Sequence, residues 1–179
     1  MLKKSVLLVI VLIVALSCAF AGSSDKGVID ITLTPSSKQM IKVDKDTYKS
    51  TSGFGASVGY MKSVAKGLSV GAALEWGNFK QEKLLSYGAF NTVAILARCD
   101  YKFNLSEKVF ADAGLGLGYE LCIVGKNTFN SFVAELTGEF GITVDSVFSV
   151  LAGAKGKAAI QKTTQVFSVL PFVGAGITL

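Results

Sequence analysis

Apolar residues alternate with small or polar residues along most of the chain. The pattern is clearest in YKFNLSEKVFADAGLGLGYEL, residues 101–121, where every second residue from Val109 to Leu121 is apolar and most residues between are glycines or acids. A period of two residues places the apolar side chains on one face of a β-strand. Eight segments share this period: 28–34, 52–61, 67–78, 89–103, 108–123, 131–144, 147–157 and 165–179. The sequence therefore predicts an all-β chain with eight strands.

The connections between these segments differ in length. Short polar stretches such as 104–107 join the second strand to the third, the fourth to the fifth and the sixth to the seventh, whereas longer stretches such as 35–50 join the others. Bacterial outer-membrane barrels alternate short periplasmic turns with longer extracellular loops in this way. We therefore predict an eight-stranded antiparallel up-and-down transmembrane β-barrel with both termini on the periplasmic side.

The two faces of the predicted strands favour lipid outside and a narrow lumen inside. The polar face is dominated by small residues, as in 55–59 and 114–118, and small side chains suit the lumen of an eight-stranded barrel. Aromatic residues of the apolar face gather near both strand ends, as membrane-interface girdles do. The expected girdles contain Phe54, Trp76, Tyr119, Phe132 and Phe167 at the long-loop end, and Tyr60, Tyr101, Phe103, Phe140 and Phe148 at the short-turn end. The alternative is a secreted or lipid-anchored soluble β-domain with an apolar interior.

The first 21 residues have the features of a secretory signal peptide. Lys3 and Lys4 precede an apolar run over 6–16, and the small residues of Ala19-Phe20-Ala21 follow it. We therefore expect a signal peptide over 1–21 and one barrel domain over 22–179. A second interpretation takes Cys18 as a lipidation site, because residues 15–18 resemble a lipoprotein cleavage box with its leucine at a different offset.

The signal peptide, the eight amphipathic strands and glycine-rich patterns such as VFADAGLGLGYE resemble the small outer-membrane β-barrel families of the opacity-protein and OmpA/OmpX kind. The resemblance implies a non-enzymatic, monomeric protein of the bacterial outer membrane. It also implies outer-membrane lipid and the outer-membrane assembly machinery as partners. The chain departs from the usual pattern at its last residue, which is Leu179 rather than an aromatic residue.

Composition excludes several kinds of chemistry. The chain has no histidine, so neither a Ser-His-Asp triad nor a histidine-based metal site can form. The GLGLG stretch resembles a phosphate loop but does not open a helix after a strand. Removal of Lys3 and Lys4 with the signal peptide lowers the formal charge from +5 to +3, which is too mild to indicate nucleic-acid binding. We expect no enzymatic activity, no cofactor and no metal.

Charged residues on the lumen face are the candidate site, because an unpaired charge there is costly. The expected structural cluster consists of Arg98, Asp112, Glu139, Glu135, Lys155 and Glu75. A turn centred near Asp145 would bring Glu135 opposite Lys155. Arg98 would lie level with Asp112 and Glu139 and bind both acids. We favour a plug that holds the barrel closed over a selectivity filter or proton path.

The segments that connect the predicted strands contain most of the basic residues that could contact a ligand. The first contains Lys38, Lys42, Lys45 and Lys49, and the last contains Lys157 and Lys162 without an acid. A basic surface of this kind could contact an extracellular anionic ligand, but we favour the simpler interpretation that these are solvated loops at the rim of the barrel. The sequence thus predicts a structural or surface-interaction role through basic extracellular loops. A narrow transporter or porin for small or hydrophobic solutes is the alternative.

Two smaller expectations concern the strand register and a proline. A turn centred near Ser106 would place Cys99 opposite Ala113 on the lipid face, with Cys122 facing the lumen, so both thiols would be free. Pro171 lacks a donor for a closed ladder and is expected at a bulge or near the outer rim.

Overall fold

The computed structural model describes residues 27–43, 46–81, 89–125, 127–161 and 164–179, and the structural statements below concern these residues. The segment 1–21, expected to be a signal peptide and containing Cys18, lies outside the described residues, as do Lys45 and Lys162. Among the described residues, no helix is long and apolar enough to cross a membrane.

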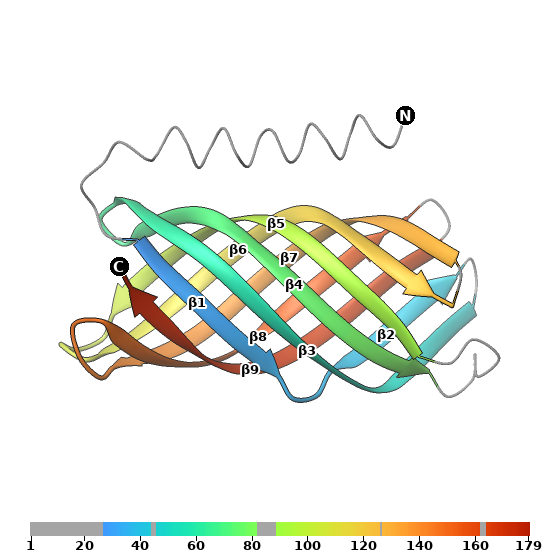
Figure 1. Ribbon diagram of the computed structural model, residues 1–179, viewed down its shortest axis with the longest axis horizontal. Coiled ribbons are helices and arrows are strands. Elements are labelled where there is room, and N and C mark those ends of the chain that lie inside the picture. The colour runs from blue at the N-terminus through green and yellow to red at the C-terminus, as the bar shows by residue number, and fades with distance from the viewer. Residues whose placement is uncertain (1–26, 44–45, 82–88, 126, 162–163) are drawn as a thin grey trace.

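The described chain consists of antiparallel strands wound obliquely around one axis (Figure 1). The strands are β1 (Gly27–Thr34), β2 (Lys38–Val43), β3 (Asp46–Ala65), β4 (Leu68–Gln81), β5 (Ala89–Asn104), β6 (Val109–Val124), β7 (Asn127–Thr143), β8 (Phe148–Ile160) and β9 (Thr164–Thr178). Both β1 and β2 pair with β3 on one side and with β9 on the other, so together they occupy one strand position in the barrel wall. The predicted eight-stranded closed up-and-down barrel is therefore confirmed.

The break between β1 and β2 coincides with both prolines of the chain. Pro35 lies in the break, and Pro171 of β9 lies between the residues that pair with the end of β1 and the start of β2. On its other side Pro171 pairs in regular register with Ala154. A residue without an N–H is tolerated where the ladder is interrupted. Pro171 thus lies in the wall beside the break between β1 and β2, and the expected position at a bulge or near the outer rim is wrong.

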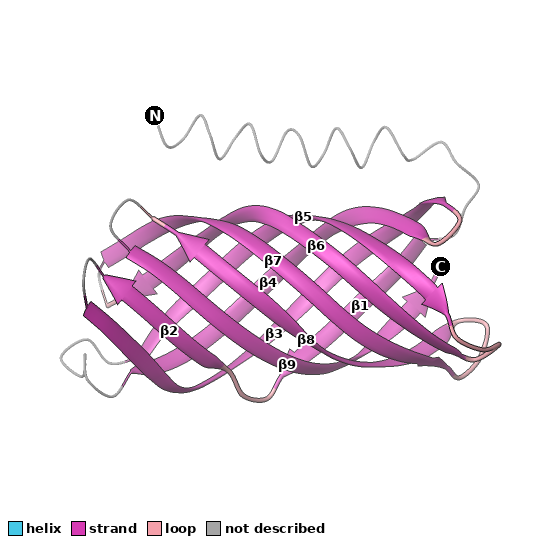
Figure 2. Cartoon of the chain, turned by 180° about the vertical axis from the view of Figure 1, so that it is seen from behind, coloured by secondary structure: helices cyan, strands magenta, loops and turns pink. Residues whose placement is uncertain are grey.

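The connections do not follow the predicted alternation of lengths. The segment 35–50, expected as a loop, contains β2 and the first residues of β3. The alternating pattern of this segment was hidden by its lysines, which lie on the outward face at Lys38 and Lys42. As a result only two residues, 44–45, separate β2 from β3, and only two, 125–126, separate β6 from β7. Figure 2 shows the described turns as short segments at both ends of a long barrel.

The aromatic residues lie at two levels of the outer wall. Phe103 and Phe148 lie within one residue of strand ends at the end of the barrel that holds Leu179, here called the terminal end. Phe54 and Trp76 form an edge-to-face pair with 5.2 Å between ring centroids, and Phe132 contacts Tyr119 in the same way at 6.1 Å. This second girdle is not at the strand ends, because β7 begins five residues before Phe132 and β9 begins three residues before Phe167.

The opposite end, here called the distal end, therefore projects past its girdle. At about 3.3 Å per residue, these two strands continue roughly 10 to 16 Å along their length beyond the aromatic rings. The predicted girdles thus enclose an apolar band that begins at the terminal end and stops short of the distal rim.

The lipid-facing assignment makes a prediction at Leu74, which is exposed on the outer face of β4 between the girdles. Replacement Leu74→Arg is expected to lower the free energy of unfolding in lipid vesicles by about 2–4 kcal/mol, because a charge would enter hydrocarbon. Urea titration followed by tryptophan fluorescence measures it. Gln165→Arg, an outward position beyond the distal girdle, is the control and is expected to change stability by less than about 1 kcal/mol. Equal effects at both positions would contradict the proposed membrane band.

Candidate functional site

Five charged side chains from four strands meet in the lumen. They are Glu75 of β4, Glu120 of β6, Glu135 of β7, and Lys155 and Lys157 of β8, and each residue is at most 8% exposed. Each occupies an inward position because its strand neighbours point outward in the period of two. A folded protein tolerates charges buried this deeply only when they are paired and hydrogen-bonded.

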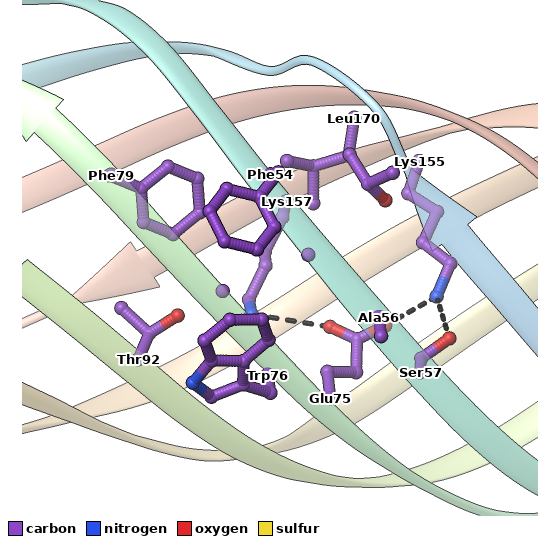
Figure 3. A pocket seen from close by; sticks show the side chains of 13 residues that line it. Phe54, Ala56, Ser57, Glu75, Trp76, Phe79, Thr92, Lys155, Lys157 and Leu170 are labelled. Carbon is purple, nitrogen blue, oxygen red and sulfur yellow. Dashed lines mark hydrogen bonds and ion pairs between the residues drawn. The ribbon is translucent and has the colours of Figure 1, made fainter.

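Glu75 is the centre of this cluster (Figure 3). Its carboxylate accepts hydrogen bonds from Lys155 Nζ and, at 3.3 Å, from Lys157 Nζ. Lys157 Nζ also forms an ion pair of 2.6 Å with Glu120 Oε2. Lys155 Nζ donates to Ser57 Oγ at 3.2 Å and lies 3.9 Å from Glu135 Oε1. Three acids and two lysines thus form one connected network, which we call the Glu75 network.

A second ion pair lies closer to the terminal end. Arg98 Nη2 donates to Asp100 Oδ2 at 2.6 Å, and both residues are buried. A Cβ at Gly114 on the neighbouring strand would collide with Asp100 Oδ1, so this glycine makes room for the carboxylate. Gly141 does the same for the ring of Phe110. Glycine at these inward positions therefore leaves space for a larger side chain on the neighbouring strand, and Gly114 belongs to the GLGLG stretch.

The six predicted cluster residues divide into two groups. The structure brings Glu75, Glu135 and Lys155 together in the Glu75 network. Asp112 and Glu139 pair opposite each other on β6 and β7, whereas Arg98 pairs with an acid of its own strand. Among the described residues, no ion pair joins Arg98 to Asp112 or to Glu139. The expected arginine fork between those two acids is therefore wrong.

The error comes from the register at the turns. Glu135 lies opposite Lys157 rather than Lys155. In the β7–β8 turn, Asp145 Oδ1 accepts hydrogen bonds from the backbone N–H groups of Val147 and Phe148, both at 2.8 Å. This Asx-type turn moves the centre of the hairpin one residue along the chain, and a shift of one residue at the centre changes the pairing by two.

The β5–β6 hairpin shows the same offset. Cys99 lies opposite Leu115, not Ala113. Both thiols are free, with Cys99 exposed on the outer wall and Cys122 half-buried.

Lys157 is the functional residue that sequence reasoning missed. It was expected in a basic outer loop, but β8 continues to Ile160 and buries this lysine in the lumen. The signal was present in the segment AKGKAAI, where Lys155 and Lys157 are two residues apart and so share a face. The expected basic loop is corrected as well, because Lys38 and Lys42 lie in β2 and Lys49 lies in β3.

Apolar side chains seal the lumen on the distal side of the Glu75 network. The rings of Phe79 and Phe90 stack with centroids 5.3 Å apart, and they pack with Ile41 and Leu170. The cavity beside Glu75, drawn in Figure 3, has a volume of only about 30 Å³. That is about the volume one water molecule occupies in the liquid. Around Glu75 and the Phe79–Phe90 stack, the lumen is therefore filled by side chains.

No protein-family model and no curated protein matches the chain. Solved structures do match it. Neisserial surface protein A (NspA) superposes with a TM-score of 0.65 at 16% identity, covering 86% of this chain and 97% of that one. Ail, the attachment invasion locus protein of Yersinia pestis, has a TM-score of 0.55 at 12% identity in its complex with the heparin analogue sucrose octasulfate, covering 88% of this chain and 100% of that one.

The chain has the fold of the small outer-membrane β-barrels. The likeness rests on architecture, since identities of 12–16% show the fold alone. It agrees with the exposed apolar band between two aromatic girdles and with the predicted resemblance to this group of barrels. Among the described residues, no group of three or more cysteine or acidic side chains is placed to hold a metal ion.

The Glu75 network predicts a large stability effect from a single carboxylate. Glu75→Ala removes the carboxylate that Lys155 and Lys157 share, and it is expected to lower the free energy of unfolding by about 3–5 kcal/mol. The measurement is urea unfolding in lipid vesicles, followed by circular dichroism. Glu107→Ala, in the exposed β5–β6 turn, is the matched control and should stay within about 0.5 kcal/mol of the wild type. A Glu75→Ala protein as stable as the control would show that the network contributes little.

Proposed function

We propose that the protein is a non-enzymatic, monomeric barrel of the bacterial outer membrane, with a structural lumen and a distal end that contacts ligands outside the cell. The sealed lumen carries this proposal. A route for solutes would need to pass the Glu75 network and the stacked rings of Phe79 and Phe90, and the cavity between them has room for about one water molecule. The function is therefore assigned to the outer surface.

The distal end offers a basic surface for that role. Lys38 and Lys42 are exposed and lie on the outward face of β2, with Lys42 beyond the distal girdle residue Phe167 and Lys38 at the level of that girdle. Lys49 lies on the paired part of β3, opposite Met40. Ammonium groups on the outward face of the barrel suit an anionic ligand such as a sulfated glycan. The Ail structure in complex with sucrose octasulfate shows that another barrel of this fold carries such a ligand.

The route to the membrane belongs to the same proposal. Residues 1–21 direct export and are removed, leaving 22–179 as the barrel domain. The outer-membrane assembly machinery then inserts a chain whose final strand is β9, with the terminal end on the periplasmic side. The backbone N–H of Leu179 bonds the carbonyl of Gly27 at 2.8 Å, so the last residue helps to close the barrel although it is not aromatic.

The sealed lumen predicts that purified wild-type protein gives no stable conductance steps in planar lipid bilayers. A known porin in the same membranes shows that the measurement can detect channels. The transporter hypothesis predicts discrete openings instead. Large, stable channels formed by the wild-type barrel would overturn the assignment of a closed structural lumen.

The basic distal surface predicts retention on a heparin column at low salt. Lys38→Gln combined with Lys42→Gln is expected to elute at clearly lower salt, because two ammonium groups that pair with the sulfate groups of heparin would be lost. The control is the pair Lys66→Gln and Lys108→Gln, which removes two exposed lysines from the turns at the terminal end. Equal shifts in both pairs would indicate binding through net charge alone.

A further inference from the structure

The lipid-facing wall is hollowed over β8. The outward residues in the middle of this strand are small, including Gly156 and Ala158, while its neighbours β7 and β9 carry Leu136 and Val169. The hollow is a groove of about 820 Å³, far larger than the cavity in the lumen. It lies within the apolar band, so the surrounding solvent is hydrocarbon rather than water.

The strand register defines the shape of the groove. Leu136, Gly156, Val169 and Lys38 lie directly opposite one another on four adjacent strands. Leu136 and Val169 form the walls, each well exposed, and Gly156 forms the floor. A Cβ built on Gly156 would meet no atom within 4 Å, so packing inside the protein does not require glycine here. The space above Gly156 is open to an external occupant.

A positive charge marks one end of this row. Lys38 lines the groove and is exposed. It lies two residues from Met40, which pairs with the girdle residue Phe167, so its ammonium group lies at the level of the membrane interface. Among the described residues, none forms an ion pair with Lys38. An apolar groove with an unpaired cation at its interfacial end matches the chemistry of an anionic lipid.

We propose that this groove binds one anionic phospholipid. The acyl chain lies over Gly156 and Ala158 between the walls formed by Leu136 and Val169, and the headgroup phosphate pairs with Lys38. The inference rests on the proposed membrane location and extends it from general lipid contact to a defined site. A second copy of the chain is a poorer occupant, because the outward positions of the described strands between the two girdles hold no aspartate or glutamate that could pair with Lys38.

Native mass spectrometry of the refolded barrel, released from micelles that contain phosphatidylglycerol, tests the site. The wild type is expected to retain one lipid molecule. Gly156→Phe fills the floor and is expected to weaken retention about tenfold, as the loss of roughly two buried methylene contacts would. Gly138→Phe is the matched control, since Gly138 is also exposed with open space around its Cβ position and does not line the groove.

The headgroup is tested separately. Lys38→Gln is expected to remove the preference for phosphatidylglycerol over zwitterionic phosphatidylcholine while leaving acyl-chain retention in place. Unchanged retention in Gly156→Phe, or equal retention of the two lipids by the wild type, would overturn the proposal. A two-chain species that Gly156→Phe abolishes would identify the groove as an interface between copies and would also overturn it. The conductance result does not involve this groove, and heparin retention of the single variant Lys42→Gln tests the basic surface without Lys38, which alone of the two lysines lines the groove, so the two proposals fail separately.

Discussion

The lumen of an eight-stranded barrel is only wide enough for side chains to fill it, so every charge that points inward must find its partner inside. The Glu75 network meets this constraint across the lumen. Glu75 comes from β4 and its two lysines come from β8, strands that are not neighbours in the wall. The ion pairs therefore tie opposite sides of the barrel together, in addition to the hydrogen bonds between adjacent strands.

The same narrowness explains the composition of the inward face. Asp100 and Phe110 are accommodated because the facing positions are Gly114 and Gly141. Large and small inward residues thus alternate around the lumen, and the stacked pair Phe79 and Phe90 completes the filling toward the distal end. Because side chains fill the interior around Glu75, the proposed contacts with partners are placed on the outer surface and the rims.

The outer surface follows a different rule, since hydrocarbon does not demand dense packing within the protein. Glycine can therefore remain at an outward position without a neighbour over it, as Gly156 does. Inward glycines such as Gly114 are explained by the side chains opposite them, whereas packing within the described chain does not account for the outward Gly156. The distal extension adds a second outward feature, because its strands continue past the girdle and carry Lys42 into water.

The sequence alone determined the class of fold, the two faces of the strands and the residues of both girdles, because a period of two and aromatic position are local properties. It also identified Glu75, Glu135 and Lys155 as lumen charges. Only the tertiary structure decided their partners. The Asx turn at Asp145 shifted the β7–β8 pairing by two residues, and barrel closure brought β8 across from β4. Neither the hydrogen bonds of a turn nor contacts across a lumen leave a periodic signal in sequence, which is why the ion pairs of Lys157 with Glu75 and Glu120 and the groove over Gly156 emerged only from the folded chain.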